Sequence, residues 1–440
     1  MSWPYYPELL ATPVPRYTSY PTAAAFHDGV GASEMEAALM SVPDGTDISL
    51  YVHFPFCREI CWYCGCNTGA ANRAHRLEAY LEALNVEIGL VAGRLAGRGR
   101  VRRIAFGGGS PNAMPVEAFV ALAERVRQEF GADDPIVSVE LDPRGFDHGW
   151  AAALAAIGAE KASLGVQSFD RDIQRAIGRI QPRGMVGIAV DLLRAAGISS
   201  LNFDLMYGLP GQGLGELEAT LRTALAMNPD RIALFGYAHV PDLIPRQRRI
   251  DAASLPSSEA RFRQAAFGHE FLTARGYEPV GFDHFAAPSD PLAAAAREGR
   301  LRRNFQGFTD DPSDILIGLG ASAISQFPDA LIQNEKNAGR YRMLTLAGRL
   351  PAARGIERSS EDRVRGGIIE ALLCRGIADT GGIGAIDQRA RLRAFEESGL
   401  LGWAGDRLTL SAGALPYART IAAAFDTWRQ PGVRQSSNAV

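Results

Sequence analysis

Six short β-rich runs alternate with helical patterns after residue 45, and this rhythm constrains the fold more than any other feature of the chain. Each run leads into Gly, Pro, His or Asp and is followed by a segment with helical spacing. The runs are 48–55, 101–111, 136–143, 161–169, 201–210 and 231–241. Strands that alternate with helices form a parallel sheet, either as a barrel or as a doubly wound sheet. The sequence therefore predicts an α/β fold.

The segments between these runs place apolar residues on one helical face and end in glycines suited to a left-handed cap. The apolar faces are Leu77, Leu81, Leu84, Ile88 and Val91, and Leu214, Leu217, Leu221 and Leu225; the cap glycines are Gly158, Gly197 and Gly276. From about Gly339 the strand–helix rhythm stops. We therefore expect an N-terminal arm (1–46), a barrel region with an extension (47–338) and a small, mostly helical, winged-helix-like domain (339–440).

Unusual polar and glycine-rich residues gather at the ends of the predicted strands. They are a cysteine-rich loop at 57–66, the sequence GGGSP at 107–111, Glu140, Gln167, Asp204 and His239. In parallel α/β sheets the carboxyl ends of the strands meet on one rim, where the chemistry is located. These residues therefore predict one functional site.

Composition excludes several classes of protein. The chain has a formal charge of −3 and a pI near 6.2, which offers no electrostatic footprint for nucleic acid. Its N-terminal stretch has no signal-peptide pattern, and no segment has the ~18 apolar residues of a membrane helix. Five cysteines in 440 residues are too few and odd in number for a disulfide scaffold. We expect a cytoplasmic protein that binds neither nucleic acid nor membrane.

Four of the five cysteines lie in FCREICWYCGCNT, where Cys57, Cys61 and Cys64 have the spacing CxxxCxxC. Three thiolates on one loop would each hold one iron of a [4Fe-4S] cluster and leave the fourth iron open to a small molecule. Cys66 follows too closely to complete the same cluster. Zinc binding lacks a second CxxC-type pair, and a redox CxxC would leave Cys57 unexplained. Cys374, in an apolar helix, is interpreted as a buried small hydrophobe.

The cysteine spacing after the first predicted strand resembles that of the radical S-adenosylmethionine enzymes. The wider pattern resembles the oxygen-independent coproporphyrinogen III oxidases over nearly the whole chain. The matching motifs are PRYTSYPTA (15–23), YVHFPFC, CREICWYCGCN with its extra Cys66, FGGGSP, VELDPR, LGVQSFD, IGRIQP, DLMYGLPGQ, GYAHVP, VGFDHFA and RRNFQGF. This resemblance implies a partial (β/α)6 TIM-like barrel whose site the N-terminal arm helps to close.

The resemblance also implies a cluster on Cys57, Cys61 and Cys64 and two molecules of S-adenosylmethionine. Tyr51 and Glu140 match contacts to the first molecule, and Gly108, Gly109 and Ser110 match the turn at its methionine part. Tyr63, Gln167, Arg179 and Asp204 match contacts to the second molecule, with Ala238 and Ile324 as backbone or apolar contacts. Cys66 and Tyr51 match catalytic positions. Without the resemblance, the glycine turn could be a plain turn or a phosphate loop, although the missing GKS or GKT sequence weakens the phosphate interpretation. Glu140 and Asp204 would then be ordinary rim or capping carboxylates.

The activity that the resemblance implies is the oxidative decarboxylation of two propionates of coproporphyrinogen III to vinyl groups. It requires an electron donor and a terminal acceptor, neither of which the sequence identifies, and we expect a monomer. Because the substrate is anionic and the chain slightly acidic, local arginines must attract it, and Arg16, Arg302 and Arg303 are the candidates. His53, His239 and His284 are expected to line the strand ends as hydrogen-bonding residues.

One segment departs from the family pattern, and two rival functions stay open. After Cys374 the sequence RGIADTGGIG is shortened and glycine-rich, which puts the substrate geometry in question. One rival is a haem-binding chaperone of the same superfamily, disfavoured by Cys66 and PRYTSYP. The other is a related methyltransferase or cyclopropane-forming enzyme, which product mass would distinguish.

Overall fold

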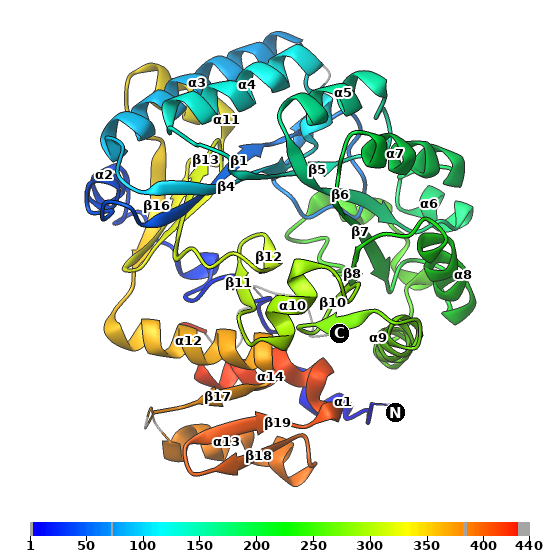
Figure 1. Cartoon of the computed structure of the whole chain (residues 1–440). Helices are drawn as coiled ribbons and strands as arrows, with labels where there is room; N and C mark the ends of the chain where they lie inside the picture. Colours follow the sequence, from blue (N-terminus) through cyan, green and yellow to red (C-terminus); the bar gives the residue numbers. More distant parts are fainter. Residues whose placement is uncertain (1–2, 72–73, 382, 384, 430–440) are drawn as a thin grey trace.

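A curved sheet of twelve strands forms the centre of this computed structural model, which describes residues 3–71, 74–381, 383 and 385–429 (Figure 1). Seven neighbouring strands run parallel: β13 (Ile315–Leu319), β1 (Asp47–Phe54), β4 (Arg100–Gly108), β5 (Ile136–Leu141), β6 (Ala159–Gln167), β7 (Ser200–Tyr207) and β8 (Arg231–Gly236). All six predicted strands are therefore confirmed. The sequence missed β13, which is the seventh parallel strand.

Antiparallel strands extend the sheet on both sides. They are β10 (His284–Ala286) and β9 (Glu278–Val280) beyond β8, and β14 (Ile324–Phe327), β15 (Ala330–Asn334) and β16 (Ala352–Glu357) beyond β13. Because β16 and β9 are the two ends of the sheet order, the barrel stays open between them. The predicted end of the strand–helix rhythm near Gly339 is wrong, because β16 still belongs to the main sheet.

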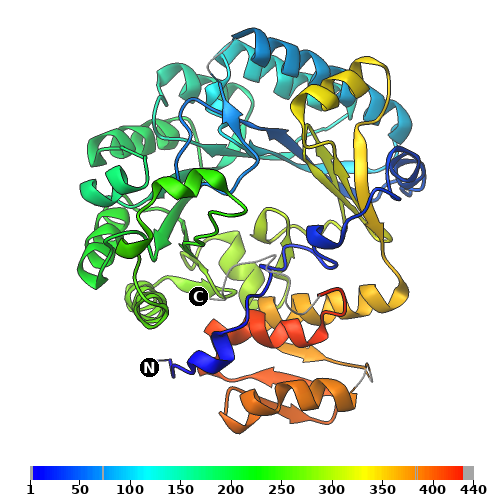
Figure 2. The same ribbon diagram turned by 180° about the vertical axis from the view of Figure 1, so that it is seen from behind.

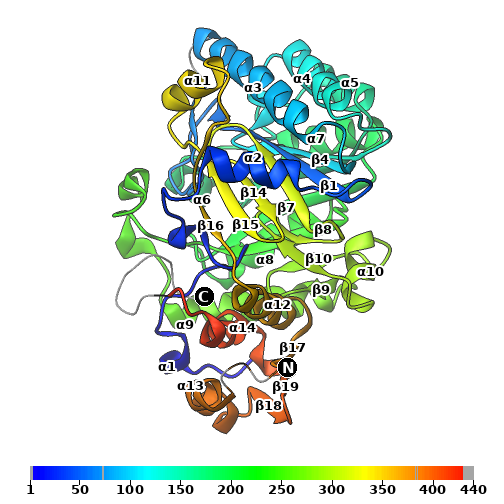
Figure 3. The ribbon, with the colours of Figure 1, turned by 90° about the vertical axis from the view of Figure 1, so that its left-hand side faces the viewer.

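Helices cover the outer face of the curved sheet (Figures 1 and 3). They are α3 (Ala74–Leu95), α4 (Val116–Glu129), α5 (His148–Ala156), α6 (Arg171–Ala176), α7 (Arg183–Ala195), α8 (Leu214–Leu225), α9 (Ser258–Thr273) and α11 (Ala338–Leu346). The short helix α10 (Pro291–Arg297) lies instead inside the curve of the sheet, against β9 and β10. The predicted apolar faces pack on the core, except that Leu214 at the start of α8 is 44% exposed. Gly158, Gly197 and Gly276 all have positive φ, which confirms them as left-handed caps.

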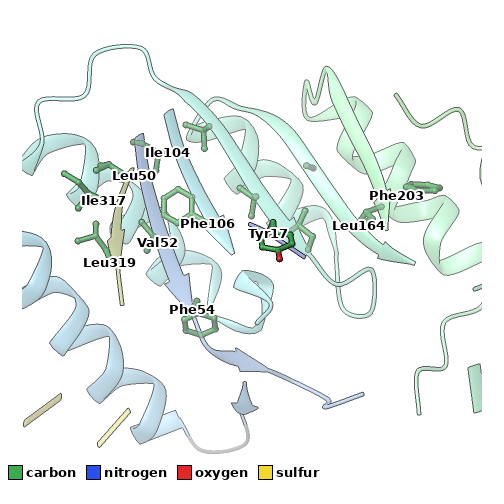
Figure 4. Packing of buried hydrophobic residues seen from close by; sticks show 14 of the residues in the cluster. Tyr17, Leu50, Val52, Phe54, Ile104, Phe106, Leu164, Phe203, Ile317 and Leu319 are labelled. Carbon is green, nitrogen blue, oxygen red and sulfur yellow. The ribbon is translucent and has the colours of Figure 1, made fainter. Parts of the chain in front are cut away.

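The core forms in cross-strand layers because the parallel strands are buried on both faces. Leu50 of β1 lies between Ile104 of β4 and Ile317 of β13, and Val52 lies between Phe106 and Leu319 in the same way (Figure 4). Each of these side chains is less than 5% exposed. This packing fixes the register of β1 and hence the position of the loop that follows it.

The N-terminal arm runs from the C-terminal region to the β16 edge of the sheet (Figure 2). It contains α1 (Pro7–Leu10) and α2 (Ala32–Met40), and His27 bridges Gly355 of β16. The Tyr17 hydroxyl donates to Asp426 Oδ2 at 3.0 Å, which ties the arm to the end of the described chain.

The C-terminal region packs beneath the open side of the barrel (Figures 1 and 3). It comprises α12 (Ser360–Arg375), β17 (Ile377–Asp379), α13 (Ala385–Glu397), β18 (Leu401–Ala404), β19 (Arg407–Leu410) and α14 (Ala418–Ala422). The strands form an antiparallel sheet of order β17-β19-β18. The three-part domain division and the winged-helix likeness stay predictions. None of the described helices combines the length and the apolar character needed to cross a membrane.

Candidate active site

The cysteine loop follows β1 directly and is closed at its base by backbone pairing. The short strand β2 (Phe56–Cys57) pairs with β3 (Gly69–Ala70), so both ends of the loop are fixed against each other. Cys61 is buried, Cys57 and Cys64 are partly buried, and Cys66 is exposed. Burial therefore decreases along the loop from Cys61 to Cys66, the one cysteine of the four that is exposed.

The glycine turn at the end of β4 is hydrogen-bonded to the backbone that leads into this loop. The Gly109 N–H donates to Phe54 O and the Ser110 N–H to Phe56 O, each at 2.8 Å. A Cβ on Gly109 would lie 2.4 Å from Phe56 O, which is backbone and has no room to move. Glycine at this position is therefore required for the close approach of the two chains.

The same turn makes room for the carboxylate of Glu140 on β5. A Cβ on Gly107 would lie 2.5 Å from Glu140 Cδ, and the Gly108 N–H donates to Glu140 Oε2 at 3.0 Å. Burial raises the pKa of Glu140 to about 7, and the nearby Asp204 raises it further, while the Gly108 hydrogen bond opposes the shift. No cation pairs with this carboxylate among the described residues, so it is available to an external one. Gly107, which belongs to the predicted GGGSP motif but matched no cofactor contact, therefore has a role in making room for this carboxylate.

The donor set of the loop suits an iron–sulfur cluster. Arg179 Nη1 and Arg144 Nη2 donate to Cys61 Sγ at 3.2 and 3.4 Å, and cations of this kind stabilise thiolates. A hydrogen bond from the Cys66 side chain lowers the pKa of Cys64 to about 6. Burial and the neighbouring thiols Cys64 and Cys61 raise the pKa of Cys57 to about 12, a cost that coordination to a metal removes.

The thiols do not converge on one point. No three His, Cys, Asp or Glu side chains in the described part of the chain are placed to hold a single metal ion. A cubane cluster has a different requirement, because each thiolate binds its own iron. The lack of a single-ion site among the described residues is therefore consistent with such a cluster.

Side chains of a segment after β8 also contact the cysteine loop. The segment includes the 3₁₀ helix η3 (Pro245–Arg249), where Arg246 donates to Thr68 and to the Cys66 carbonyl and Arg249 lies over the Trp62 ring at 5.0 Å. The buried Gln247 side chain donates to both Tyr63 O and Ala238 O, at 2.9 and 3.0 Å. Gln247 therefore joins two predicted cofactor contacts. Gln247 was not among the predicted site residues, although it lies in the conspicuous run PRQRR.

The other predicted site residues lie on the inner strands. Tyr51 donates or accepts a hydrogen bond with His53 Nδ1 at 3.2 Å, and burial lowers the pKa of His53 to about 4, which keeps the imidazole neutral. Asp204 accepts from Ser163 and Asn202. Ile324 begins β14, where a Cβ on Gly318 would lie 2.6 Å from its carbonyl oxygen, and Gly318 is in register with Tyr51.

Gln167 is the most strained of these residues. It is buried, ends β6 next to a break in the β6–β7 register, and has φ of +65°, a region that residues other than glycine rarely occupy. Its side-chain amide makes no hydrogen bond with the described residues. Strain held at a strand end, together with an amide that no protein group engages, favours a ligand contact at this position.

Arg179 is instead committed to the protein itself. Besides Cys61, its nitrogens donate to Gln181 Oε1 at 2.9 Å, Gly165 O at 2.5 Å and Asp142 Oδ2 at 3.2 Å. This side chain is therefore engaged on every nitrogen before any ligand arrives. Its geometry favours positioning of the cysteine loop over the predicted contact with the second cofactor.

Two of the predicted histidines and two of the predicted substrate arginines are engaged by groups of the protein. His239 and His284 are hydrogen-bonded to Tyr237 and Asp283, as expected for satisfied residues. Arg302 pairs with Glu370 and Asp314, each at 2.9 Å. The Arg303 side chain donates to the carbonyls of Arg16 and Tyr17 and so fixes the arm. The predicted burial of Cys374 is confirmed.

Comparisons with known proteins agree with this geometry. The model of the radical SAM superfamily matches residues 51–224. The oxygen-independent coproporphyrinogen III oxidase of Bradyrhizobium diazoefficiens is 43% identical over 437 residues, which cover 97% of this chain and 97% of that protein. The enzyme of the same name from Paracoccus denitrificans is 44% identical over 362 residues, covering 82% of this chain and 80% of that protein.

A solved structure matches over the full length. It is the coproporphyrinogen III oxidase of Escherichia coli, described as a radical SAM enzyme, with a TM-score of 0.90 and 33% sequence identity. The match covers 98% of this chain and 100% of that one. The arm, the open barrel and the C-terminal region are thus all part of the shared architecture.

Proposed function

This chain belongs to the oxygen-independent coproporphyrinogen III oxidase family of radical SAM enzymes, and from that premise we propose that it converts two propionates of coproporphyrinogen III into vinyl groups, giving protoporphyrinogen IX. The observation that carries the proposal is the cysteine loop, whose first residues are hydrogen-bonded to the glycine turn that also holds Glu140, a carboxylate without a cation partner among the described residues. This is the layout needed to hold a cluster and a cationic cofactor side by side.

Cys57, Cys61 and Cys64 would hold the [4Fe-4S] cluster, and S-adenosylmethionine would bind over it. Together these groups supply the radical chemistry that an unactivated C–H bond requires, which no side-chain base provides. The resemblance implies that Gly108, Gly109 and Ser110 contact the polar end of the cofactor, while their N–H groups hold Glu140 and the start of the cysteine loop in place. Glu140 would accept hydrogen bonds from the ammonium group of the cofactor, because no cation among the described residues pairs with its carboxylate.

The remaining residues orient the reactants. Tyr51 is held by the neutral His53, so its hydroxyl has a fixed direction toward the site. Cys66 is the one exposed cysteine of the loop, and its side chain is hydrogen-bonded to Cys64, which would place its thiol beside the cluster. We place both as catalytic residues.

A second molecule of S-adenosylmethionine would contact Tyr63, Gln167, Asp204, Ala238 and Ile324. The free amide of Gln167 and the coupling of Tyr63 to Ala238 through Gln247 support this assignment. The finer expectations belong to the same proposal: a monomeric cytoplasmic enzyme that binds no nucleic acid or membrane and uses a separate electron donor and acceptor.

The test is anaerobic reconstitution with iron and sulfide, followed by product analysis with coproporphyrinogen III, S-adenosylmethionine and a chemical reductant. We expect CO2 release and a divinyl product. Tight haem binding without CO2 release would identify the chaperone, and added methyl or methylene mass would identify the other rival.

Cysteine variants test the assignment of the loop. Cys57→Ala, Cys61→Ala or Cys64→Ala should abolish bound iron, the brown colour and turnover, because each removes one iron ligand. Cys66→Ala should retain iron but lose turnover, and Cys374→Ala, far away in α12, should retain both. Loss of iron in the Cys66 variant would contradict the ligand assignment; the measurements are iron content, visible absorbance and CO2 release.

A further inference from the structure

A small cavity at the carboxyl ends of β7 and β8 is closed by the N-terminal arm and the C-terminal region. Its walls include Trp3, Arg16, Tyr207, Arg261, Asp283 and Arg419. We call this cavity the arginine pocket. Arg16 comes from the arm, Arg261 from α9 and Arg419 from α14, so three distant segments each contribute one guanidinium. Such convergence of cations in one cavity is costly unless an anion joins them.

The charge of the arginine pocket is not balanced by the protein. Among its described lining residues Asp283 is the one carboxylate, and it is hydrogen-bonded to His284 Nδ1 at 2.7 Å. Burial, followed by repulsion from Arg16, lowers the pKa of Arg419 to about 10. Three guanidinium groups thus face the cavity with one carboxylate, which is already engaged.

The hydrogen-bonding capacity of these arginines is also unused. The Arg419 side chain makes no hydrogen bond with the described residues and lies near the Phe282 ring, 5.5 Å from its centroid. Arg261 donates Nη2 to Tyr237 O at 2.7 Å, but its buried Nε has no partner in the described chain. Because each buried donor without a partner costs free energy, the unpaired groups point to a missing acceptor.

Size and position narrow the identity of that acceptor. The cavity holds about 50 Å3, whereas one water needs only ~10–15 Å3. It therefore admits a group the size of a carboxylate but not a tetrapyrrole ring. Arg16 donates to Gly236 O and Arg261 to Tyr237 O, directly before the predicted cofactor contact Ala238. The pocket is thus adjacent to the candidate active site without containing its residues.

We propose that the arginine pocket binds the carboxylate of one unreacting propionate and so anchors the tetrapyrrole beside the active site. This inference rests on the proposed function for the identity of the ligand. A guanidinium binds a carboxylate through two parallel hydrogen bonds, which gives orientation as well as affinity. Arg419 and Arg261 supply the unused donors, and Arg16 closes the cavity from the arm.

The test uses coproporphyrin III, the stable fluorescent oxidised form, as the probe on reconstituted enzyme. Arg419→Ala should weaken its binding about 10- to 100-fold, the range expected for a lost charged hydrogen bond. Arg419→Lys should recover part of the affinity, because lysine keeps the positive charge but cannot make the two parallel hydrogen bonds of a guanidinium. Arg393→Ala on α13, which removes an exposed ion pair with Glu397, is the matched control and should bind as the wild type does.

Further measurements separate the alternatives. The tetramethyl ester of coproporphyrin III lacks the charges and should bind wild type and Arg419→Ala equally. Because Arg419 is unpaired and repelled by its neighbours, the variant should melt at the wild-type temperature or above; a lower melting temperature would indicate a structural role and overturn the proposal. Weaker binding of S-adenosylmethionine with unchanged porphyrin affinity would assign the pocket to the carboxylate of the cofactor instead.

The outcome is independent of turnover. If wild type binds coproporphyrin III through Arg419 but releases no CO2 from the reduced substrate, the proposed function fails and the carboxylate pocket stands. If wild type releases CO2 and Arg419→Ala binds the porphyrin normally, the pocket assignment fails alone.

Discussion

Two groups of arginines lie at the carboxyl end of the sheet in opposite electrostatic states. Beside the cysteine loop, Arg144 and Arg179 share the carboxylate of Asp142, at 2.7 and 3.2 Å. In the arginine pocket, Arg419 has no hydrogen-bond partner among the described residues and Arg261 has a buried free nitrogen. The first group is complete within the protein, and the second is not.

The difference separates positioning from binding. A buried cation that is fully paired holds its partners in one geometry. Its removal leaves the partner carboxylate buried without a counter-charge, which destabilises the fold. A buried cation that lacks a partner lowers stability until a ligand arrives, which is a common cost of function. The paired arginines therefore hold the cysteine loop in position, and the unpaired arginines are available to bind an anion.

Removal of Arg179 tests the paired side of the comparison and has the largest expected effect. Arg179→Ala should reduce the free energy of unfolding by about 3 kcal/mol, because Asp142 and Cys61 both lose a buried partner. Urea unfolding of the apoprotein, followed by circular dichroism, measures this change. Arg419→Ala, treated identically, should cost nothing; an equal loss in the two variants would abolish the distinction.

Glu140 extends the comparison to the opposite charge, because it is a carboxylate without a cation. Burial raises its pKa to about 7 from the usual 4.5, so the folded state disfavours the ionised form. Its destabilising effect is complete above pH 7 and disappears as the pH falls toward 4.5. Glu140→Gln should therefore stabilise the apoprotein by about 2 kcal/mol at pH 8 and by much less at pH 5.

The pH dependence is measured as the difference in urea unfolding between Glu140→Gln and wild type at several pH values. Glu124→Gln, at an exposed position on α4, is the control and should show no such slope. A stability difference that does not change with pH would mean that Glu140 is charged and satisfied in the fold. The stabilised variant should also lose activity, since it no longer accepts the cofactor ammonium.

The local part of the site could be predicted from the sequence because its geometry is local. Cys57, Cys61 and Cys64 lie on one loop, and the glycine turn and Glu140 each follow or end a predicted strand. Parallel strand ends converge on one rim, so their positions in the sequence were enough to bring them together. The six strands were predicted for the same reason, since each carries its own apolar run.

The rest depends on contacts between distant segments. Arg16, Arg261 and Arg419 meet only after the arm and the C-terminal region dock, and no spacing in the chain records that meeting. An arginine within the apolar run YARTIAAAF was the one visible signal of Arg419. Similarly, β16 was missed because it is an antiparallel edge strand whose sequence, AARGIE, lacks the apolar run that marked each of the six predicted strands.

Arg302 gives the smallest expected effect and the most direct test of the rule that paired arginines do not bind substrate. It was predicted to attract propionates, yet it pairs with Glu370 and Asp314, and its side chain is 33% exposed. Because partly exposed ion pairs contribute little, Arg302→Ala should reduce the free energy of unfolding by less than about 1 kcal/mol. The affinity of Arg302→Ala for coproporphyrin III, measured by fluorescence titration, should equal that of the wild type. A loss of affinity comparable to that of Arg419→Ala would show that an engaged arginine exchanges its protein partners for the substrate. The hydrogen bonds of the free protein would then no longer distinguish arginines that position the fold from arginines that bind substrate.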